Sequence, residues 1–442
     1  MIEEAIKGFS KEFIEASNKK NICIISNFDT DGIISAAIFS KTLERLNKKF
    51  SIKILKQLNK QEIDSFPKEQ LIILLGMGSN NLEDISSLNQ EIFIIDNHEL
   101  IPFESKNLHI LNPHLFKEFE ELCISELSFL ISREFSQDNK DLSQLSIIGM
   151  IGDNLEKEIS KTRSKLIKES EVKIRKGLLI YPSTRPLDKA LEFCSRPFIP
   201  GVTGDAKGTY ELLKEAGIEK GEKGFRSLIE LEEEEMKRLV TAVALRLSAK
   251  ESSRFIGNLY LVKFYNKLED ARELSAIINA CSRMGKPEIA LMLCLGNSEY
   301  RKKAERIYFK YRQHIISGLK YIENNEKIQG REYIIINAKD NIKDTIIGTI
   351  ASILSFSPIY KEGTIIIAMA YNEDKIKVST RIAGRDNKSR RNLKDFLESI
   401  AEDLGAEFGG HKQSAGCTIK KDQEEKFIEL VKKKLEYELI KV

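Results

Sequence analysis

Five short apolar runs follow one another within the first 115 residues, and they constrain the fold more than any other feature of the chain. They occupy residues 21–28, 50–58, 70–78, 91–99 and 107–114. Helical patterns separate several of them, most clearly at residues 32–49. Parallel strands need a crossover connection that is usually a helix, so this alternation is typical of a parallel sheet. The sequence therefore predicts an N-terminal α/β domain built on a parallel sheet.

Polar residues follow the first and fourth of these runs, where buried strands are predicted to end. The first run continues as NFDTDG, with Asp29 and Asp31, and the fourth continues into Asp96, Asn97 and His98. Aspartate is depleted in strands and costly to bury, so its presence here needs a reason. Ligands of open α/β sheets bind beyond the carboxyl ends of the strands. These side chains are therefore predicted to converge.

Two chemical interpretations of these aspartates remain open. With Asp153 in GMIGDN they supply carboxylates and a histidine, which are suitable ligands for Mg²⁺ or Mn²⁺. Two such ions about 3.5–4 Å apart stabilise the attacking and leaving oxygens of a phosphoester displacement. The alternative is structural, because Asp29 or Asp31 could cap the helix that begins near Ile33, and Asp96 could begin a turn.

The remainder of the chain predicts a helical extension, a long helix and a second domain. Residues 205–252 are rich in Glu and Lys at helical spacing, and residues 156–297 are predicted to form a mainly helical extension of the first domain, residues 1–155. One apolar stripe runs through residues 298–328 and predicts a single connecting helix. Strand patterns and a helical pattern follow it, so residues 329–442 are predicted to form a smaller α+β domain.

Composition excludes several classes of protein. Of the 442 residues, 41% are hydrophobic and 31% are charged, and no apolar run is long enough to span a bilayer. The N-terminus lacks the basic region and apolar core of a signal peptide, so we expect a cytoplasmic protein. The six cysteines form no C-x-x-C pair and are predicted to be reduced core thiols. The net charge is only +3, so a nucleic-acid surface must be a local patch.

The segment GGHKQSAGC, residues 409–417, has the composition of a phosphate-binding loop. The paired Gly409 and Gly410 let main-chain amides approach a phosphate, and His411 and Lys412 add donors. The alternative is a turn between a helix and a strand, in which glycine supplies a positive φ. The segment alone does not decide between a binding loop and a turn.

Two sets of arginines are further candidates for contact with nucleic acid. Arg381 and Arg385 belong to the basic segment STRIAGRDNKSRRNLK, which predicts either a phosphate-binding surface or a solvated charged face. Arg283 follows Arg272 and Asn279 at helical spacing, so the three residues either line one face toward nucleic acid or bond to neighbouring loops.

The motifs NFDTDG, IIDNHE, ILNPHLF, IIGMIGDN and GGHKQSAG, in this order, resemble those of the DHH phosphoesterase superfamily. The likeness is to archaeal RecJ-like proteins with a DHH-associated C-terminal domain, and it spans most of the chain. It implies an N-terminal α/β domain that holds two Mn²⁺ or Mg²⁺ ions, a connecting helix and a small C-terminal domain. It also implies that a nucleic-acid strand lies between the two domains.

Three positions differ from the ligand pattern that the resemblance implies. Asn27 stands where active members have His or Asp, and Asn97 replaces the first histidine of the Asp-His-His triplet. Gly76 stands where an aspartate normally bridges both metals, and only a shifted alignment would recruit Asp84 instead. The ligand-type residues that remain at matching positions are Asp29, Asp31, Asp96, His98 and Asp153.

The missing ligands predict weak metal binding. A carboxylate that bridges two cations offsets their mutual repulsion, and glycine offers no side chain for this task. Asparagine is a poor substitute for imidazole at a transition metal. We therefore expect one ion or none, held by Asp29, Asp31 and Asp153 with help from His98, and two-metal hydrolysis that is lost or very slow.

The resemblance also implies a function and partners. In the family, the loop that matches Gly409, Gly410 and His411 and the arginine that matches Arg381 contact the nucleic-acid backbone. We expect a binder of single-stranded DNA or RNA with little or no nuclease activity, acting as accessory partner of a repair or replication helicase. A nuclease-dead eukaryotic relative that is a helicase subunit provides the precedent. The alternatives are an active Mn²⁺- or Mg²⁺-dependent single-strand exonuclease and a phosphodiesterase for small oligonucleotides or cyclic dinucleotides.

Overall fold

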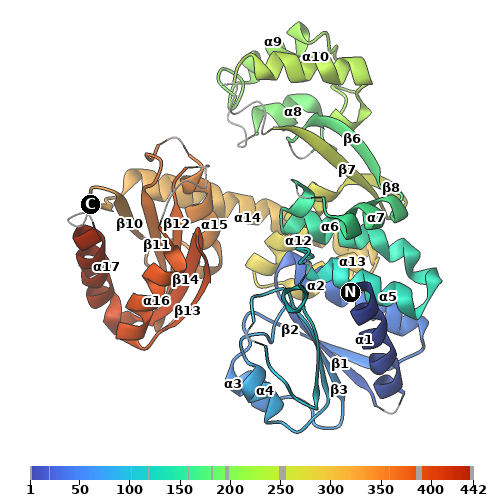
Figure 1. Ribbon diagram of the computed structural model, residues 1–442. Coiled ribbons are helices and arrows are strands. Elements are labelled where there is room, and N and C mark those ends of the chain that lie inside the picture. Colours follow the sequence, from blue (N-terminus) through green and yellow to red (C-terminus); the bar gives the residue numbers. More distant parts are fainter. Residues whose placement is uncertain are drawn as a thin grey trace. The chain divides into compact units, whose positions relative to one another are not determined.

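The apolar runs of the first 115 residues form one five-stranded parallel sheet in the computed structural model, as their order predicts (Figure 1). Its strands, in spatial order, are β2 (Phe50–Leu55), β1 (Ile22–Asn27), β3 (Leu71–Leu75), β4 (Ile92–Ile95) and β5 (Leu108–Leu111). Strands β3 and β4 are buried along their whole length, and the edge strand β2 is mostly exposed or half-buried. Because the strands are parallel, their carboxyl ends share one edge of the sheet.

The structure describes residues 2–18, 20–100, 102–117, 119–157, 159–180, 183–194, 199–247, 255–357, 359–384 and 391–438. The chain divides into two compact units, residues 1–305 and 306–442, and each unit has a hydrophobic core of its own. All six cysteines are free and buried, as predicted for core thiols. Within the ranges above, no helix combines the length and the apolar character that a membrane crossing requires.

Helices cover both faces of the parallel sheet. Helices α1 (Ile2–Ser17) and α2 (Thr30–Arg45) lie on one face, and the short helices α3 (Lys60–Asp64) and α4 (Leu82–Ser86) pack against the other. Aromatic rings in edge-to-face contact join α1 and α2 to β4, and they belong to Phe9, Phe13, Phe39 and Phe93. Burial on both faces accounts for the nearly continuous apolar character of the inner strands.

Helix α2 is the centre of the first unit, and 13 of its 16 residues are buried. Four helices surround it: α5 (Ile124–Phe135), α6 (Ser143–Gly152), α12 (Ala271–Arg283) and α13 (Pro287–Cys294). A helix buried on all sides must be apolar all round, and the sequence GIISAAIF meets this requirement. The first turn of α2 is therefore held in place from several sides.

The extension of the first unit contains a sheet as well as helices. Strands β6 (Lys173–Leu178), β7 (Ile256–Phe264) and β8 (Lys267–Asp270) form an antiparallel sheet, which the expectation of a mainly helical segment missed. Strand β6 reads KIRKGL and carries three cations, so it lacks the apolar run by which a strand is recognised. Besides α12 and α13, the α-helices described in the extension are α7 (Lys161–Glu169), α8 (Leu187–Glu192), α9 (Ala206–Glu215) and α10 (Glu233–Ala244).

The predicted connecting helix is α14 (Ser298–Asn324), a single helix of 27 residues. Its apolar stripe includes Ala304, Tyr311 and Ile322, which are buried. The division between the two compact units falls inside this helix, at residues 305 and 306.

The second unit contains a mixed six-stranded sheet with helices on both faces (Figure 1). Its strands, in spatial order, are β13 (Glu407–His411), β14 (Ser414–Lys420), β12 (Lys375–Ile382), β11 (Ile365–Asn372), β10 (Tyr333–Asn337) and β9 (Ile328–Gln329). Helices α16 (Leu393–Leu404) and α17 (Glu424–Glu438) contribute to the core on one face. Helix α15 (Asp344–Ser355) packs against β11 and β12. The unit is thus the α+β domain that the sequence predicts.

Candidate metal centre and nucleic-acid surface

Asp31 joins the first turn of α2 to the start of α5. Its side chain is 3% exposed, and its Oδ2 accepts a hydrogen bond of 2.6 Å from the main-chain N–H of Ile124. Its Oδ1 accepts a second bond of 3.0 Å from the N–H of Ser125. The first N–H groups of a helix have no partner within the helix, so Asp31 satisfies two of these donors. The carboxylate therefore has a structural task that its position in the sequence does not disclose.

A buried ion pair fixes the helix start that Asp31 contacts. The Glu126 carboxylate accepts from the main-chain N–H of Cys123 at 2.9 Å and pairs with Arg163, whose Nε lies 2.7 Å from Oε1. Both side chains of the pair are almost completely buried. Removing one partner of such a pair leaves an uncompensated buried charge, so the pair is costly to break. The amides of Ile124 and Ser125 are consequently held where Asp31 can reach them.

Asp29 caps helix α2, which is the structural alternative considered for it. Its Oδ1 accepts from the N–H of Gly32 at 2.7 Å, and its Oδ2 accepts from the side-chain amide of Asn27 at 3.0 Å. A Cβ atom at Gly32 would clash with the main-chain oxygen of Asn27, which explains the glycine of the motif. The Oδ1 atom of Asn27 is buried without a hydrogen-bond partner.

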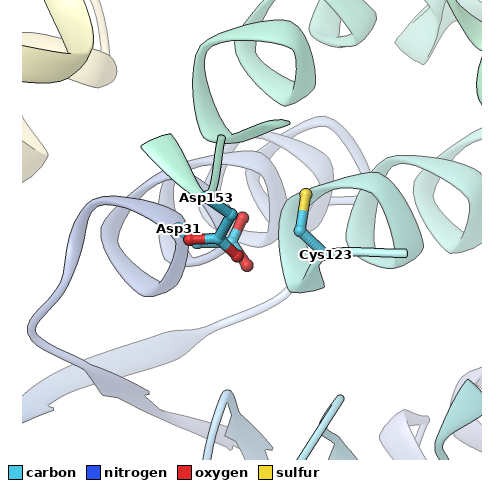
Figure 2. Close-up of side chains that lie close together, drawn as sticks. All are labelled: Asp31, Cys123 and Asp153. Carbon is cyan, nitrogen blue, oxygen red and sulfur yellow. The ribbon is translucent and has the colours of Figure 1, made fainter. Parts of the chain in front are cut away.

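Asp153 and Cys123 lie beside Asp31 and form the one group of potential metal ligands found in the described part of the chain. Asp153 ends helix α6, and one ligand atom from each of the three residues lies within 4.8 Å of the others. Figure 2 shows the carboxyl groups of Asp31 and Asp153 next to each other, with Cys123 at their side. Helix α6 packs closely against α5 at Gly149. A side chain there would prevent this contact, because its Cβ atom would clash with Ser125.

Burial and mutual repulsion raise the pKa values of these carboxyl groups. Burial, together with the charge of Asp29, raises the pKa of Asp31 to about 6, although the hydrogen bonds from Ser125 and Ile124 oppose the shift. The pKa of Asp153 lies well above its usual value because its carboxyl group loses water and faces Asp31 and Asp29. Burial also raises the pKa of Asp29. The group therefore has excess negative charge that a proton or a cation relieves.

The pKa shift of Asp153 predicts a stabilising substitution. Ionised Asp153 destabilises the folded state, so the wild type loses stability as the pH rises through the raised pKa, whereas an Asp153→Asn variant does not. Although its carboxyl group faces Asp31, Asp153 as a whole is exposed, so solvent screens much of the repulsion and we expect a gain of only about 1 kcal/mol in the free energy of unfolding at pH 8. The gain should vanish near pH 4. Urea unfolding at both pH values tests this, and an equal gain at both would contradict it.

Asp96 and His98 form a hydrogen-bonded pair of their own. Asp96 is 1% exposed and accepts from the N–H of Ser79 at 3.0 Å and from His98, whose Nδ1 lies 2.7 Å from Oδ1. Although burial opposes the change, the contact with His98 lowers the pKa of Asp96, and Asp96 in turn raises the pKa of His98. The side chain of Asn97 donates to the main-chain oxygen of Leu122 at 3.4 Å. The residues of the predicted triplet are thus occupied by internal hydrogen bonds.

The donor set does not fit a pair of Mn²⁺ or Mg²⁺ ions. Gly76 follows β3 with φ +72°, and a Cβ atom there would lie 3.4 Å from the Cβ of Asn27, so a side chain at this position would enter the centre. Glycine leaves that bridging position without a carboxylate, and Asp84 lies in α4, outside the ligand group. Cys123 adds a soft sulfur donor, which these hard cations do not favour.

Arg283 belongs to the same centre. It is the last residue of α12, and its guanidinium carbon lies 5.3 Å from the ring centroid of Phe28. Its charge favours the ionised form of Asp29 and opposes the rise of that pKa, as His98 does. Arg283 therefore compensates part of the negative charge of the acidic group. It belongs to the first unit, whereas Arg381 belongs to the second.

Arg381 is held against helix α15 in the second unit. Its Nε donates to Ser352 Oγ at 2.9 Å, and its terminal nitrogen donates to the main-chain oxygen of Thr380 at 2.8 Å. In the sheet register, Arg381 lies opposite Ser414, which itself lies opposite His411. Directly opposed residues of antiparallel strands project from the same face. Arg381 therefore shares one row of the sheet with Ser414 of the glycine segment.

The glycine segment forms a hairpin, which corrects the expectation that it lies between a helix and a strand. Gly409, Gly410 and His411 belong to the edge strand β13, and Lys412 lies in the turn that leads to β14. Helix α16 instead ends at Gly405, whose φ of 61° meets the requirement for a positive angle. At Gly410 a Cβ atom would clash with Ala415. Arg385, the other predicted contact, lies outside the described residues.

Three family models match consecutive parts of the chain. The DHH family N-terminal domain matches residues 21–150, the DHH-CID domain residues 180–255 and the DHHA1 domain residues 330–436. The chain belongs to the DHH superfamily. The three matches follow the architecture of this DHH protein: the first covers the parallel sheet, the second lies in the extension, and the third covers every strand of the six-stranded sheet except β9.

Relatives of this DHH protein include solved structures of the RecJ type. RecJ from Thermus thermophilus in complex with Mn²⁺ is 17% identical with a TM-score of 0.61, covering 97% of this chain and 54% of that chain. CDC45 from Entamoeba histolytica is 12% identical with a TM-score of 0.66, covering 97% and 98%. The chain thus spans about half the length of the Thermus protein. An uncharacterized protein of Methanocaldococcus jannaschii is 28% identical, covering 97% of this chain and 96% of its own.

The structure adds residues to the centre of the DHH protein that sequence reasoning missed. Cys123 was interpreted only as a core thiol, and the amides of Ile124 and Ser125 carry no signal in their side chains. A clue does precede α5, because Cys123 is followed three residues later by Glu126 in the pattern of a capping box. This pattern marks a helix start but does not indicate which carboxylate will contact it.

Proposed function

We propose that this DHH protein binds single-stranded nucleic acid, that its nuclease activity is lost or much reduced, and that it serves as accessory partner of a DNA repair or replication helicase. The observation that carries the proposal is the hydrogen bonding of the Asp31 carboxylate. Both of its oxygens accept hydrogen bonds from the main chain, and the neighbouring bridging position is Gly76. The centre therefore lacks the carboxylate that two metal ions would share in a two-ion hydrolytic mechanism.

The second unit supports the binding part of the proposal. Arg381 keeps a defined orientation on Ser352, and the hairpin beside it presents glycines and main-chain amides on an exposed edge strand. Arginine and closely approachable amides are the groups that bind phosphates without reading bases. Such a surface favours recognition of a nucleic-acid backbone.

The partner part of the proposal rests on the family. The likeness to CDC45 covers nearly the whole of both chains, and the likeness to RecJ covers nearly the whole of this one. A protein of this architecture that no longer hydrolyses its substrate is suited to hold a strand for another enzyme. A helicase that produces single strands is such an enzyme.

One observation favours a second candidate, a metal-dependent exonuclease with substituted ligands. Asp31, Asp153 and Cys123 are close enough to contact a single cation. RecJ from Thermus thermophilus has been solved with Mn²⁺, so a cation in a related fold has a precedent. One cation can still polarise a phosphate oxygen, although it cannot stabilise attacking and leaving oxygens together.

Calorimetric titration of metal-stripped protein with Mn²⁺ separates the two candidates. We expect no more than one ion per chain, and end-labelled single-stranded DNA incubated with the saturated protein should remain intact. An Asp31→Asn/Asp153→Asn double variant is the matched control, because turnover that persists in it comes from a contaminating nuclease. Binding of two ions together with degradation that the double variant lacks would establish the exonuclease.

A further inference from the structure

Helix α14 exposes two apolar residues on the side that faces away from the core of the second unit. On the packed side, Tyr311 is buried and bonded to α15, and a Cβ atom at Gly318 would clash with Ile350. Phe309 precedes Tyr311 by two positions and Ile316 precedes Gly318 by two, which rotates both by about 200° to the opposite side. They are 63% and 51% exposed. Neither residue therefore belongs to the apolar stripe by which α14 packs.

The ring of Phe309 is open to solvent. Phenylalanine is among the residues most often buried, yet this side chain makes no aromatic or cation–π contact with any residue that the structure describes. The neighbouring Tyr308 is different, because Arg312 lies over its ring with the guanidinium carbon 5.9 Å from the centroid. Since most of the Phe309 side chain contacts water, a ligand can lie against the ring without displacing another side chain.

Positive charge surrounds this ring, and acidic residues are absent. Between Glu305 and Glu323 the sequence contains no Asp or Glu, and its basic residues are Arg306, Lys310, Arg312, His314 and Lys320. Arg306, Lys310 and Lys320 are exposed and form no ion pair with another residue of the described ranges. Partial burial and the nearby Lys343, which precedes α15, lower the pKa of His314. This side of α14 therefore attracts phosphate.

Arg306 and Gln313 lie on the same side of α14 as Phe309. Arg306 is three residues before the ring and Gln313 is four residues after it, and residues at these spacings are neighbours on a helix surface. Arginine binds phosphate through charge-assisted hydrogen bonds, and glutamine offers a donor and an acceptor. An accessible aromatic ring next to cations that follow the backbone is the combination by which single-strand binders hold a base and its phosphate.

We propose that Phe309 is a stacking platform for a base of a single strand, and that Arg306 binds a phosphate of the same strand. The inference rests on the proposed function and adds a site on α14 to the candidate contacts at Arg381 and the hairpin. Bases of a duplex present only their edges in the grooves, so they cannot lie flat on the ring. Every base has a π-face, so the contact is tolerant of sequence.

The polar residues around Phe309 favour a nucleic acid over a protein helix. A helix that docks in a groove needs apolar contacts at positions i, i+3, i+4 and i+7. Phe309 and Ile316 occupy the first and last of these positions, but the two between them are Arg312 and Gln313. The apolar stripe is thus interrupted, whereas phosphates suit the surrounding cations.

Binding of two fluorescent oligonucleotides to the full chain tests this proposal. One is a 15-residue oligothymidylate, and the other is an abasic strand of equal length with the same phosphates. We expect Phe309→Ala to weaken binding of oligothymidylate by about five- to 150-fold, which corresponds to the stacking of one base. Its affinity for the abasic strand should stay unchanged. Arg306→Gln should weaken binding of both strands by the same factor, because both carry the phosphate.

Fluorescence of a Phe309→Trp variant reports the stacking directly. The chain contains no tryptophan, so the new indole is the only one and its emission comes from this position alone. Oligothymidylate should quench the emission, and the abasic strand should not. Leu245→Trp is the matched control, because Leu245 is 76% exposed but follows α10 in the extension, where its emission should not respond to either strand.

Ile316→Ala distinguishes stacking from general apolar contact. It shortens an exposed apolar side chain on the same side of α14 but removes no π-face, so it should keep the wild-type preference for oligothymidylate over the abasic strand. Loss of this preference in Ile316→Ala as well as in Phe309→Ala would indicate an apolar docking surface and would overturn the proposal. Equal affinity of wild type and Phe309→Ala for oligothymidylate would overturn the stacking site alone. A wild type that binds neither strand would overturn the proposed function itself.

Discussion

Replacement of Asp31 by alanine is expected to lower the free energy of unfolding by about 2–4 kcal/mol. The change removes the acceptor for the N–H groups of Ile124 and Ser125, and both groups are left unpaired in the interior. An unpaired buried donor costs about 1–3 kcal/mol. The loss should be smaller at pH 8 than at pH 5, because the wild type gives up part of its own stability as the pH rises through the Asp31 pKa of about 6.

Urea unfolding of Asp31→Ala and Asp153→Asn, followed by circular dichroism, measures this contrast. The two aspartates face each other, yet one bonds to helix α5 and the other contributes mainly repulsion. The first variant should be less stable than the wild type and the second more stable. If Asp31→Ala proved as stable as the wild type, the structural role of Asp31 would be wrong.

Replacement of Arg381 by alanine is expected to weaken binding of single-stranded DNA by about ten- to 100-fold. The substitution removes a charged donor, and hydrogen bonds that involve a charged group contribute about 1.5–3 kcal/mol. The slope of log affinity against log salt should also fall by about 0.7, the contribution of one phosphate on a single strand. Fluorescence anisotropy titrations at several salt concentrations measure both quantities.

Arg331→Ala supplies the control for Arg381→Ala. Arg331 is an exposed cation in the same unit, but it lies between β9 and β10 at the opposite edge of the sheet from the hairpin. The control removes the same charge but leaves Arg381 and the hairpin unchanged, so it should change affinity by much less. Equal losses in the two variants would mean that net charge, and not a site at Arg381, governs binding.

The parallel sheet was predictable because each of its strands is an apolar run separated from the next by a recognisable pattern. Strand β6 was not predictable, since its cations lie on an edge strand that pairs only with β7. The hairpin at Gly409 was misplaced for a different reason. Both a helix-ending turn and an edge strand accept glycine, and here the helix ends at Gly405.

The sequence names Asp31 and Asp153 of the acidic centre but neither Cys123 nor the hydrogen bonds of these residues. Asp29 and Asp31 follow β1, so sheet topology places them at the carboxyl edge of the sheet, whereas Asp153 reaches them from the end of helix α6. The contact between Asp31 and Ile124 joins positions 93 residues apart and uses a main-chain amide. No side-chain pattern encodes that choice, because every residue except proline carries the same donor.

The burial of α2 changes what the motif NFDTDG means. Asp29 begins this helix and Asp31 joins it to α5, so both side chains stabilise the fold whether or not the chain hydrolyses a substrate. A search for hydrolases guided by this motif therefore detects a helix start, whether or not catalysis persists. At Gly76, by contrast, the φ of +72° suits glycine itself, so the turn after β3 does not depend on a carboxylate at this position.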